Sequence, residues 1–210
     1  DNVILMNNGN GIALRDELNQ TAREYLSKNP NLDLYKLFFA RRCILVEGLT
    51  EELLIRAYIE SKKELSEIEV LAFHKGYQDI IKIWKKINKG TDRRLGIVRD
   101  YDNQENAKRV HEELADGQVC IKTTTGYTLE TDIVNAGNNY SILMNTYGSS
   151  MGWENMTADQ MQNDWRESKS YVMLQLCQDL RTGKLESFTM PPHIQEVISF
   201  MESEVTCDED

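Results

Sequence analysis

The stretch RCILVEGLTEE, residues 42–52, places two carboxylates directly after a short apolar run. The run at 42–46 is typical of a buried strand, and the glycine that follows it permits a tight turn into a helix at about 50–64. Glu47 comes just past the strand, and Glu51 falls in the first turn of that helix. The sequence therefore predicts that both carboxylates point to one spot above a sheet.

The same alternation of short apolar runs with helical segments continues along the chain. Strands are predicted at 42–46, 68–73, 95–99 and 118–122, and helices at about 50–64, 77–88 and 103–115. Units of this kind favour an α/β fold with a mostly parallel sheet flanked by helices. Because crossovers between parallel strands are right-handed, the carboxyl ends of all strands share one edge, where such sheets place their ligands.

The segments on either side of this core have a different pattern. Residues 3–6 predict a short isolated strand, and apolar positions at 12–28 are spaced as in a helix. A segment rich in glycine and asparagine at 135–152 precedes helices predicted at about 157–181 and 191–204. We therefore expect a linker with a helix over 1–33, the α/β core over 34–134, an additional helical part over 135–204, and an acidic tail over 205–210.

Composition excludes several classes of protein. The chain has 210 residues, 40% of them hydrophobic and 28% charged, and no run approaches the roughly 20 apolar residues of a membrane span. Its formal net charge of −10 argues against binding nucleic acid by a basic surface alone. Four widely spaced cysteines without a Cys/His cluster predict neither a zinc site nor disulfides. We expect a cytoplasmic protein that has no membrane partner.

Acidic residues also follow two further strands. Asp100 and Asp102 are two positions apart in GIVRDYDN, residues 96–103, so they project to the same side of an extended chain. Glu130 and Asp132 come just after the fourth strand. Carboxylates that meet at one edge repel each other, and divalent cations are their natural stabiliser. Since paired Mg²⁺ or Mn²⁺ ions promote phosphodiester hydrolysis, the residues predict a metal-dependent phosphoryl-transfer site.

Each acid by itself also has an ordinary structural interpretation. Glu51 and Glu130 suit the first turn of a helix, where carboxylates balance the helix dipole, and the two aspartates suit a turn. Only Glu47 lacks such an interpretation, because it directly follows a buried strand and precedes glycine. The conjunction of three acidic strand ends favours a metal site. Neither GxGxxG nor GxxxxGK[ST] occurs, so the chain carries no nucleotide-binding fingerprint.

Three segments resemble the Toprim nuclease part of overcoming lysogenization defect (OLD) family endonucleases, to which the Gabija nuclease is related. They are LYKLFFARRCILVEGLTEELLI (34–55), GIVRDYDN (96–103) and YTLETDI (127–133), and FFARRCILVEG followed by TE is the most specific stretch. The resemblance implies a Toprim-type α/β fold, metal-dependent DNA cleavage or nicking, and a role in phage defence. It also implies an ATPase domain N-terminal to this region in the full-length protein, with the strand at 3–6 as its tail.

The resemblance assigns the family's functional residues to positions of this chain. The metal ligands are Glu47, Glu51, Asp100, Asp102 and Glu130, which share two divalent cations, Mg²⁺ or Mn²⁺, with Ca²⁺ as a non-productive mimic. Glu47 is also a catalytic candidate, as a general base. The family's catalytic lysine matches Lys169 in ESKSYVMLQL, with Lys184 in TGKL as the competing assignment, and would neutralise charge on the phosphate. No role follows for Asp132.

Other polar residues near these motifs are expected to lie outside the site. Tyr101 could be taken for a topoisomerase-like nucleophile, but a tyrosine in a turn is far more often a packing or surface ring. His74 suits a turn, His111 a solvated helix face and His193 a structural helix start. Five arginines are plausible contacts to a nucleic-acid backbone, but charge runs of this size are usually solvated, so we expect them to lie outside the site: Arg41, Arg42, Arg93, Arg94 and Arg99.

Two other functions stay open on the sequence. One is another Toprim activity, as in primases or topoisomerases, although the zinc-binding cysteines expected beside it are missing and the FFARR…VEGxTE context differs. The other is a non-catalytic Toprim module that binds DNA or mediates oligomerisation, against which the acids at three strand ends speak. DNA is the expected partner, together with the N-terminal ATPase domain and a homo-oligomer formed through the full-length protein.

Overall fold

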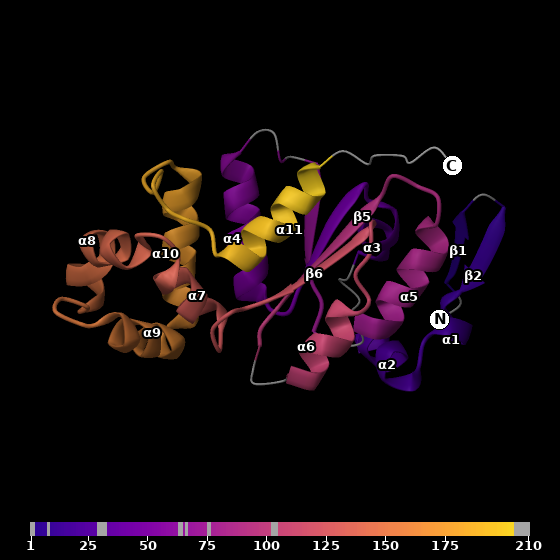
Figure 1. The fold of residues 1–210 in the computed structure, drawn as a ribbon, viewed down its shortest axis with the longest axis horizontal. Helices are drawn as coiled ribbons and strands as arrows, with labels where there is room; N and C mark the ends of the chain where they lie inside the picture. Colours follow the sequence, from indigo (N-terminus) through magenta and orange to yellow (C-terminus); the bar gives the residue numbers. More distant parts are fainter. Residues whose placement is uncertain are drawn as a thin grey trace.

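A four-stranded parallel sheet forms the centre of the molecule (Figure 1). The computed structural model describes residues 3–7, 9–28, 33–62, 65, 67–74, 77–101 and 105–203. The strands are β3 (Arg42–Val46), β4 (Ile68–Ala72), β5 (Arg94–Arg99) and β6 (Val119–Thr123), in the order β4-β3-β5-β6. Every residue of β3 and β5 is buried, as expected for strands covered on both faces. The predicted α/β fold is confirmed.

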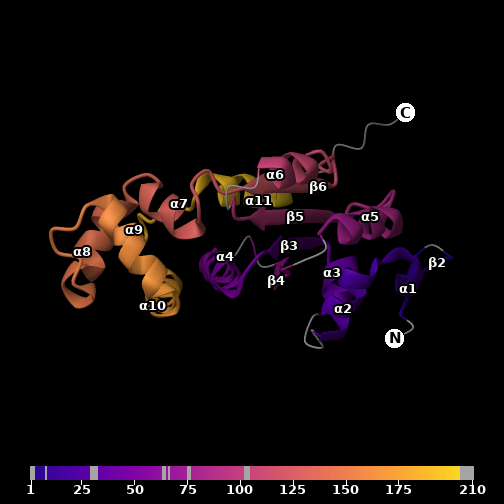
Figure 2. The same cartoon turned by 90° about the horizontal axis from the view of Figure 1, so that it is seen from below.

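Helices cover both faces of this sheet (Figure 2). Alternate residues of β3 belong to two separate cores, Ile44 and Val46 to one and Cys43 and Leu45 to the other. The first core contains residues of α4 (Leu49–Ser61) and α11 (Pro192–Glu202). The second contains residues of α3 (Leu34–Phe39) and α5 (Tyr77–Asn88), and α6 (Glu105–Glu112) contacts β6.

The N-terminal segment differs from its predicted structure. Strand β1 (Ile4–Asn7) pairs with β2 (Asn10–Ala13) in an antiparallel hairpin, followed by the short α1 (Leu14–Glu17) and by α2 (Gln20–Lys28). The predictions of an isolated strand and of one helix over 12–28 are therefore wrong. Gly9 has a φ of 80°, which favours glycine and allows the chain to reverse between the strands. Leu5 and Leu14 are buried in the same core as α5.

Four helices follow the sheet and form a lobe at one end of the molecule (Figure 1). They are α7 (Leu129–Asn135), α8 (Asn139–Met151), α9 (Ala158–Glu167) and α10 (Lys169–Arg181). Helix α8 occupies the segment in which the glycines and asparagines gave no helix prediction. The single helix predicted over 157–181 is two helices that meet at Ser168, and the first is opened by a capping box between Thr157 and Gln160.

Helix α10 lies alongside α4 and runs in the same direction (Figure 1). Arg181 at the end of α10 forms an ion pair with Glu60 near the end of α4. The first residues of the two helices, Lys169 and Leu49, therefore lie at the same end of the pair. This arrangement brings the start of α10 toward the carboxyl end of β3.

Helix α11 returns from the lobe and closes one face of the sheet. A Cβ atom at Gly96 of β5 would lie 2.5 Å from both Met201 Cε and Val197 Cγ1, so only glycine allows this close approach. Arg42 Nε donates to the carbonyl oxygen of Met201 at 2.8 Å, and the Arg94 guanidinium stacks on the Phe200 ring at 4.7 Å. None of the helices in the described ranges is long and apolar enough to cross a membrane.

Candidate functional site

Glu47 and Asp100 lie beside each other at the carboxyl ends of the two central strands. Val46 of β3 pairs with Val98 of β5, so Glu47 follows that pair on one strand and Arg99 follows it on the other. The backbone N–H of Asp100 donates to Glu47 Oε2 at 3.3 Å. The register of the parallel sheet thus places the Glu47 carboxylate against the backbone of Asp100, although the two residues are 53 positions apart in the chain.

Arg99 is part of this arrangement, and the expectation that it is solvated is wrong. The residue is only 7% exposed, and its Nε lies 3.9 Å from Glu47 Oε2. Its guanidinium covers the Tyr77 ring at 5.7 Å and donates from Nη1 to His111 Nδ1. Arg42 and Arg94 are buried as well. The burial of Arg99 could have been predicted from the alternation of β5, because Arg99 lies on the same face of the strand as buried Leu95 and Ile97.

Glu51 is buried in the first turn of α4, three residues after Gly48. Its Oε2 accepts a hydrogen bond from Thr50 Oγ1 at 3.1 Å. A Cβ atom at Gly48 would lie 2.6 Å from the same oxygen. Gly48 has extended backbone, with a φ of −133°, so its importance is the space that it leaves for the Glu51 carboxylate and not an unusual turn.

The turn before α7 is joined to the end of β5 by hydrogen bonds. The Tyr101 N–H donates to Thr124 Oγ1 at 2.8 Å, and that hydroxyl donates to the carbonyl oxygen of Gly126 at 3.0 Å. Glu130, in the first turn of α7, is 1% exposed. The acids after β5 and β6 therefore share the carboxyl edge of the sheet, with Glu130 enclosed by the protein.

Asp132 holds this turn in place. Its carboxylate accepts the N–H groups of Thr125 at 2.7 Å and Gly126 at 2.6 Å, and it pairs with His193 Nδ1 of α11 at 3.0 Å. Burial alone would raise the pKa of Asp132, but the bonds from His193 and the two backbone N–H groups outweigh burial and lower that pKa. Asp132 is thus a structural anion that fixes α7 to α11.

The candidate ligands that the structure describes do not form a closed cluster. Within the residues that the structure describes, no three Asp, Glu, His or Cys side chains gather closely enough to hold a metal ion. The Glu47 carboxylate is bonded to the Asp100 backbone, whereas Glu51 and Glu130 each lie in the first turn of a different helix. Asp102 lies outside the described residues. All five candidates offer carboxylate oxygens, so the donor chemistry fits Mg²⁺ or Mn²⁺.

The two candidate lysines lie at opposite ends of α10. Lys169 begins the helix, at the end shared with the start of α4, and its side chain is outside the described residues. Lys184 follows the other end and forms an ion pair with the buried Asp179 at 3.0 Å. Asp179 also accepts a hydrogen bond from Tyr147 Oη at 2.9 Å. Lys184 therefore has a structural partner remote from the carboxyl edge.

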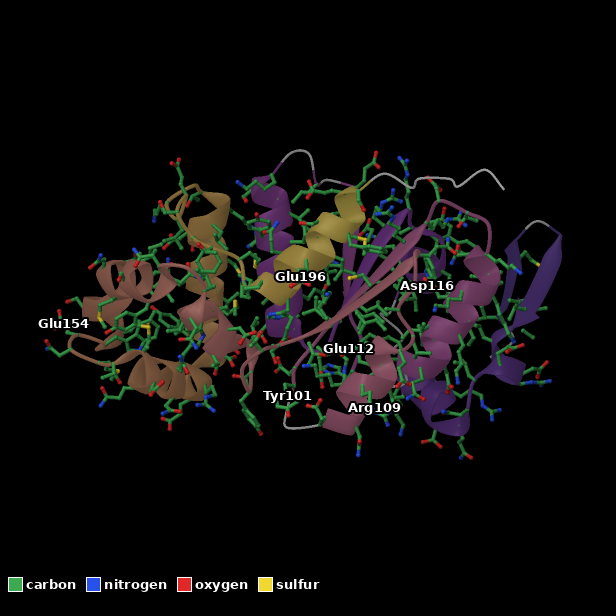
Figure 3. The ribbon with its side chains drawn as sticks, in the orientation of Figure 1. Tyr101, Arg109, Glu112, Asp116, Glu154 and Glu196 are labelled. Atoms are coloured by element: carbon green, nitrogen blue, oxygen red, sulfur yellow. The ribbon has the colours of Figure 1, made fainter. Side chains whose placement is uncertain are left out.

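Tyr101 lies in the connection from β5 to α6, near the rim of the molecule (Figure 3). Its hydroxyl donates to Glu105 Oε2 at 3.1 Å. This hydrogen bond raises the pKa of Tyr101, because the phenol proton is shared with a carboxylate. A phenol in this state is a poor nucleophile.

A comparison with known protein families gave a match to the part of the chain that contains this edge. Residues 38–102 match the model of the family described as overcoming lysogenization defect protein-like, TOPRIM domain. The match spans β3 to β5 and includes Glu47, Glu51, Asp100 and Asp102. No curated protein and no solved structure gave a significant match to the chain. Toprim domains generally bind divalent metals and act on nucleic acid. Residues 38–102 are thus similar to the Toprim domain of OLD-like proteins.

Proposed function

We propose that the chain is a divalent-metal-dependent DNA endonuclease, which nicks or cleaves phosphodiester bonds by a two-metal hydrolytic mechanism. The observation that supports this function most directly is the contact between Glu47 and the Asp100 backbone at the carboxyl edge of a parallel sheet. Both acids fall within the matched Toprim region. By its resemblance to OLD endonucleases, the chain would be the nuclease part of a larger ATPase–nuclease.

The metal ligands in this proposal are the carboxylates at the sheet edge and in the first turns of α4 and α7. Glu47, Glu51, Asp100, Asp102 and Glu130 would hold two Mg²⁺ or Mn²⁺ ions, with Ca²⁺ as a non-productive mimic. When bound, such ions supply an activated water and offset the charge of the reacting phosphate.

The protein's own residues orient and balance these carboxylates. The Asp100 N–H fixes one oxygen of Glu47, which would also assist as general base, and Arg99 offsets part of the negative charge beside it. The space at Gly48 lets the Glu51 carboxylate turn back against the β3–α4 connection. Lys169, the first residue of α10, would balance charge on the phosphate in the transition state.

The alternatives are less well supported. A topoisomerase-like Toprim enzyme needs a tyrosine nucleophile, and the Tyr101 hydroxyl is hydrogen-bonded to Glu105 with a raised pKa. A non-catalytic module has no evident use for acidic residues that follow three strands of one sheet. Hydrolysis by water is the function that uses these acids.

Plasmid nicking tests the proposal. Supercoiled DNA is incubated with the protein and Mn²⁺ or Mg²⁺, and the wild type is compared with Glu47→Gln and Asp100→Asn. We expect each substitution to lower the nicking rate by about a hundredfold or more. Glu154→Gln is the matched control, because Glu154 is exposed on the lobe far from the sheet edge (Figure 3). Nicking that persists unchanged in both folded variants would refute the assignment.

A further inference from the structure

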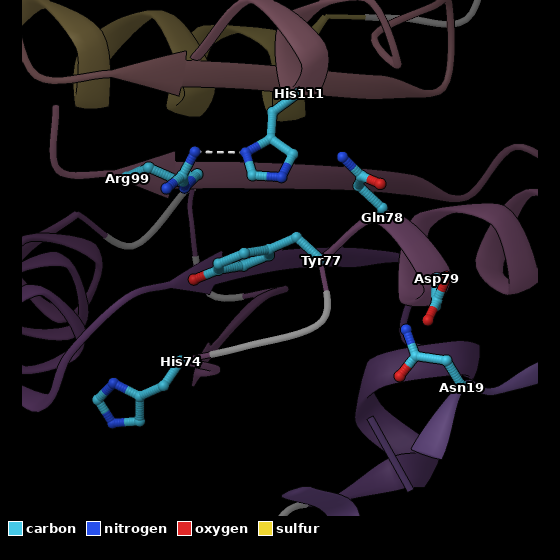
Figure 4. A pocket seen from close by; sticks show the side chains of 7 residues that line it. All are labelled: Asn19, His74, Tyr77, Gln78, Asp79, Arg99 and His111. Atoms are coloured by element: carbon cyan, nitrogen blue, oxygen red, sulfur yellow. Dashed lines mark hydrogen bonds between the residues drawn. The ribbon is translucent and has the colours of Figure 1, made fainter. Parts of the chain in front are cut away.

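A pocket of about 280 Å³ lies next to the candidate site, on the side of the sheet covered by α5 and α6 (Figure 4). Arg99, Tyr77 and His111 lie on one side of it, and Asp79 and Asn19 lie on the other. Because Arg99 also contacts Glu47, the pocket and the carboxyl edge share one side chain. Nothing in the proposed hydrolysis uses the other residues of this pocket.

The Arg99 side of the pocket presents hydrogen-bond donors. A guanidinium can only donate, so its bond to His111 Nδ1 requires that nitrogen to accept and leaves the proton on Nε2. Burial, together with the charge of Arg99, lowers the pKa of His111 to about 4, which keeps the ring neutral at physiological pH. Arg99 and His111 therefore form a fixed pair whose remaining N–H groups suit the oxygens of an anion.

The opposite side of the pocket presents an acceptor. Asp79 belongs to the first turn of α5, and its carboxylate lines the pocket near the Asn19 amide (Figure 4). A carboxylate facing a donor pair across a small space favours a ligand with an anionic group at one end and N–H groups at the other. Carboxylates accept hydrogen bonds from the exocyclic amino group of cytosine in this way.

We propose that this pocket binds one phosphate-bearing nucleotide unit, with the phosphate on Arg99 and His111 and the amino edge of the base toward Asp79. The volume of about 280 Å³ suits one such unit. The unit is either the end of a DNA strand or a free nucleoside monophosphate, which share this chemistry. The proposal deepens the proposed nuclease function, because Arg99 would link occupancy of the pocket to Glu47, but binding itself requires no metal.

Calorimetric titration in metal-free buffer, after treatment with a chelator, tests the proposal. The probes are deoxycytidine 5′-monophosphate, deoxycytidine, thymidine 5′-monophosphate and a 5′-phosphorylated oligodeoxycytidine. We expect a phosphorylated probe to bind at least about tenfold more tightly than deoxycytidine. His111→Phe and Arg99→Met should each weaken that binding about tenfold, and Asp79→Asn should remove the preference for cytosine over thymine.

Each outcome has a defined meaning. Preference for the mononucleotide identifies a free nucleotide as the ligand, and preference for the oligonucleotide identifies a strand end; both support the pocket. The proposal is overturned if the folded wild type binds none of the phosphorylated probes. It is also overturned if all three variants bind these probes as tightly as the wild type does. If His111→Phe fails to fold, the more conservative His111→Gln replaces it.

Glu47→Gln separates this proposal from the nuclease assignment. The substitution removes the charge that competes for Arg99, so binding of the monophosphate in metal-free buffer should be kept or strengthened while nicking is lost. Binding without any wild-type nicking would support the pocket and contradict the nuclease. Wild-type nicking without binding of any probe would leave the nuclease and overturn the pocket.

Discussion

Glu47 and Arg99 occupy neighbouring positions at the ends of β3 and β5, with Arg99 Nε 3.9 Å from Glu47 Oε2. The same oxygen accepts the N–H of Asp100 at 3.3 Å. A carboxylate held by a backbone N–H and a buried guanidinium is fixed in orientation, and part of its charge is offset. The positive charge of Arg99 therefore competes with any cation that Glu47 binds.

Removal of the positive charge of Arg99 should strengthen binding of a divalent cation. We expect Arg99→Gln to lower the dissociation constant for Mn²⁺ by about three- to tenfold, since the lost repulsion corresponds to roughly 1 kcal/mol for a partly exposed pair. Calorimetric titration with Mn²⁺ measures this change directly. Arg109→Gln is the matched control, because Arg109 is exposed on α6 and pairs with Glu113. Weaker Mn²⁺ binding by folded Arg99→Gln would contradict the expectation.

Gly48 should matter for activity more than for stability. A Cβ atom there would lie 2.6 Å from Glu51 Oε2, and the end of a flexible side chain can move away at little cost. We therefore expect Gly48→Ala to change the free energy of unfolding by less than about 1 kcal/mol and to lower nicking at least about tenfold. Gly117→Ala is the control, because nothing lies within 4 Å of a Cβ at Gly117. Wild-type nicking by Gly48→Ala would show that the position of Glu51 is unimportant.

The two lysines should separate catalysis from stability. Lys169→Ala should lower the nicking rate by about a hundredfold with little effect on unfolding, because the lysine begins α10 at the end nearest the carboxyl edge. Lys184→Ala removes the ion pair with buried Asp179 and should lower the free energy of unfolding by about 1–2 kcal/mol with nicking retained. Urea unfolding and plasmid nicking, measured on both variants, check the two halves. The reverse pattern would move the assignment to Lys184.

The central sheet could be predicted because its strands carry their own signals. The apolar run 42–46 coincides with β3, and the helical pattern at 77–88 coincides with α5. Buried parallel strands are continuously apolar, and glycine and polar residues mark their ends. The meeting of Glu47 with Asp100 follows from this register.

The peripheral elements could not be predicted for a different reason. The hairpin of β1 and β2 depends on pairing between segments that are each too short to show a period, and α8 is stabilised by buried Leu143 and Tyr147 despite a poor local propensity. The ion pair between Arg99 and Glu47 depends on two strands at once. A charged residue such as Arg99 is expected to be solvated when the sequence is read by itself. Its burial can be predicted only if the alternation of inward and outward residues is followed to the last residue of β5.

The contact between Asp132 and His193 should make the free energy of unfolding depend on pH in the acidic range. The folded pKa of Asp132 lies below its ordinary value of 3.8, so its contribution to stability is complete above that value and is lost as the pH falls through the folded pKa. We expect Asp132→Asn to lower the free energy of unfolding by about 2 kcal/mol at about pH 7, and the difference from the wild type to shrink toward about pH 3. Urea unfolding across this range measures it, with exposed Asp159→Asn as the control. A difference that stays constant with pH would mean that Asp132 acts by packing and hydrogen-bond geometry, and not through its charge.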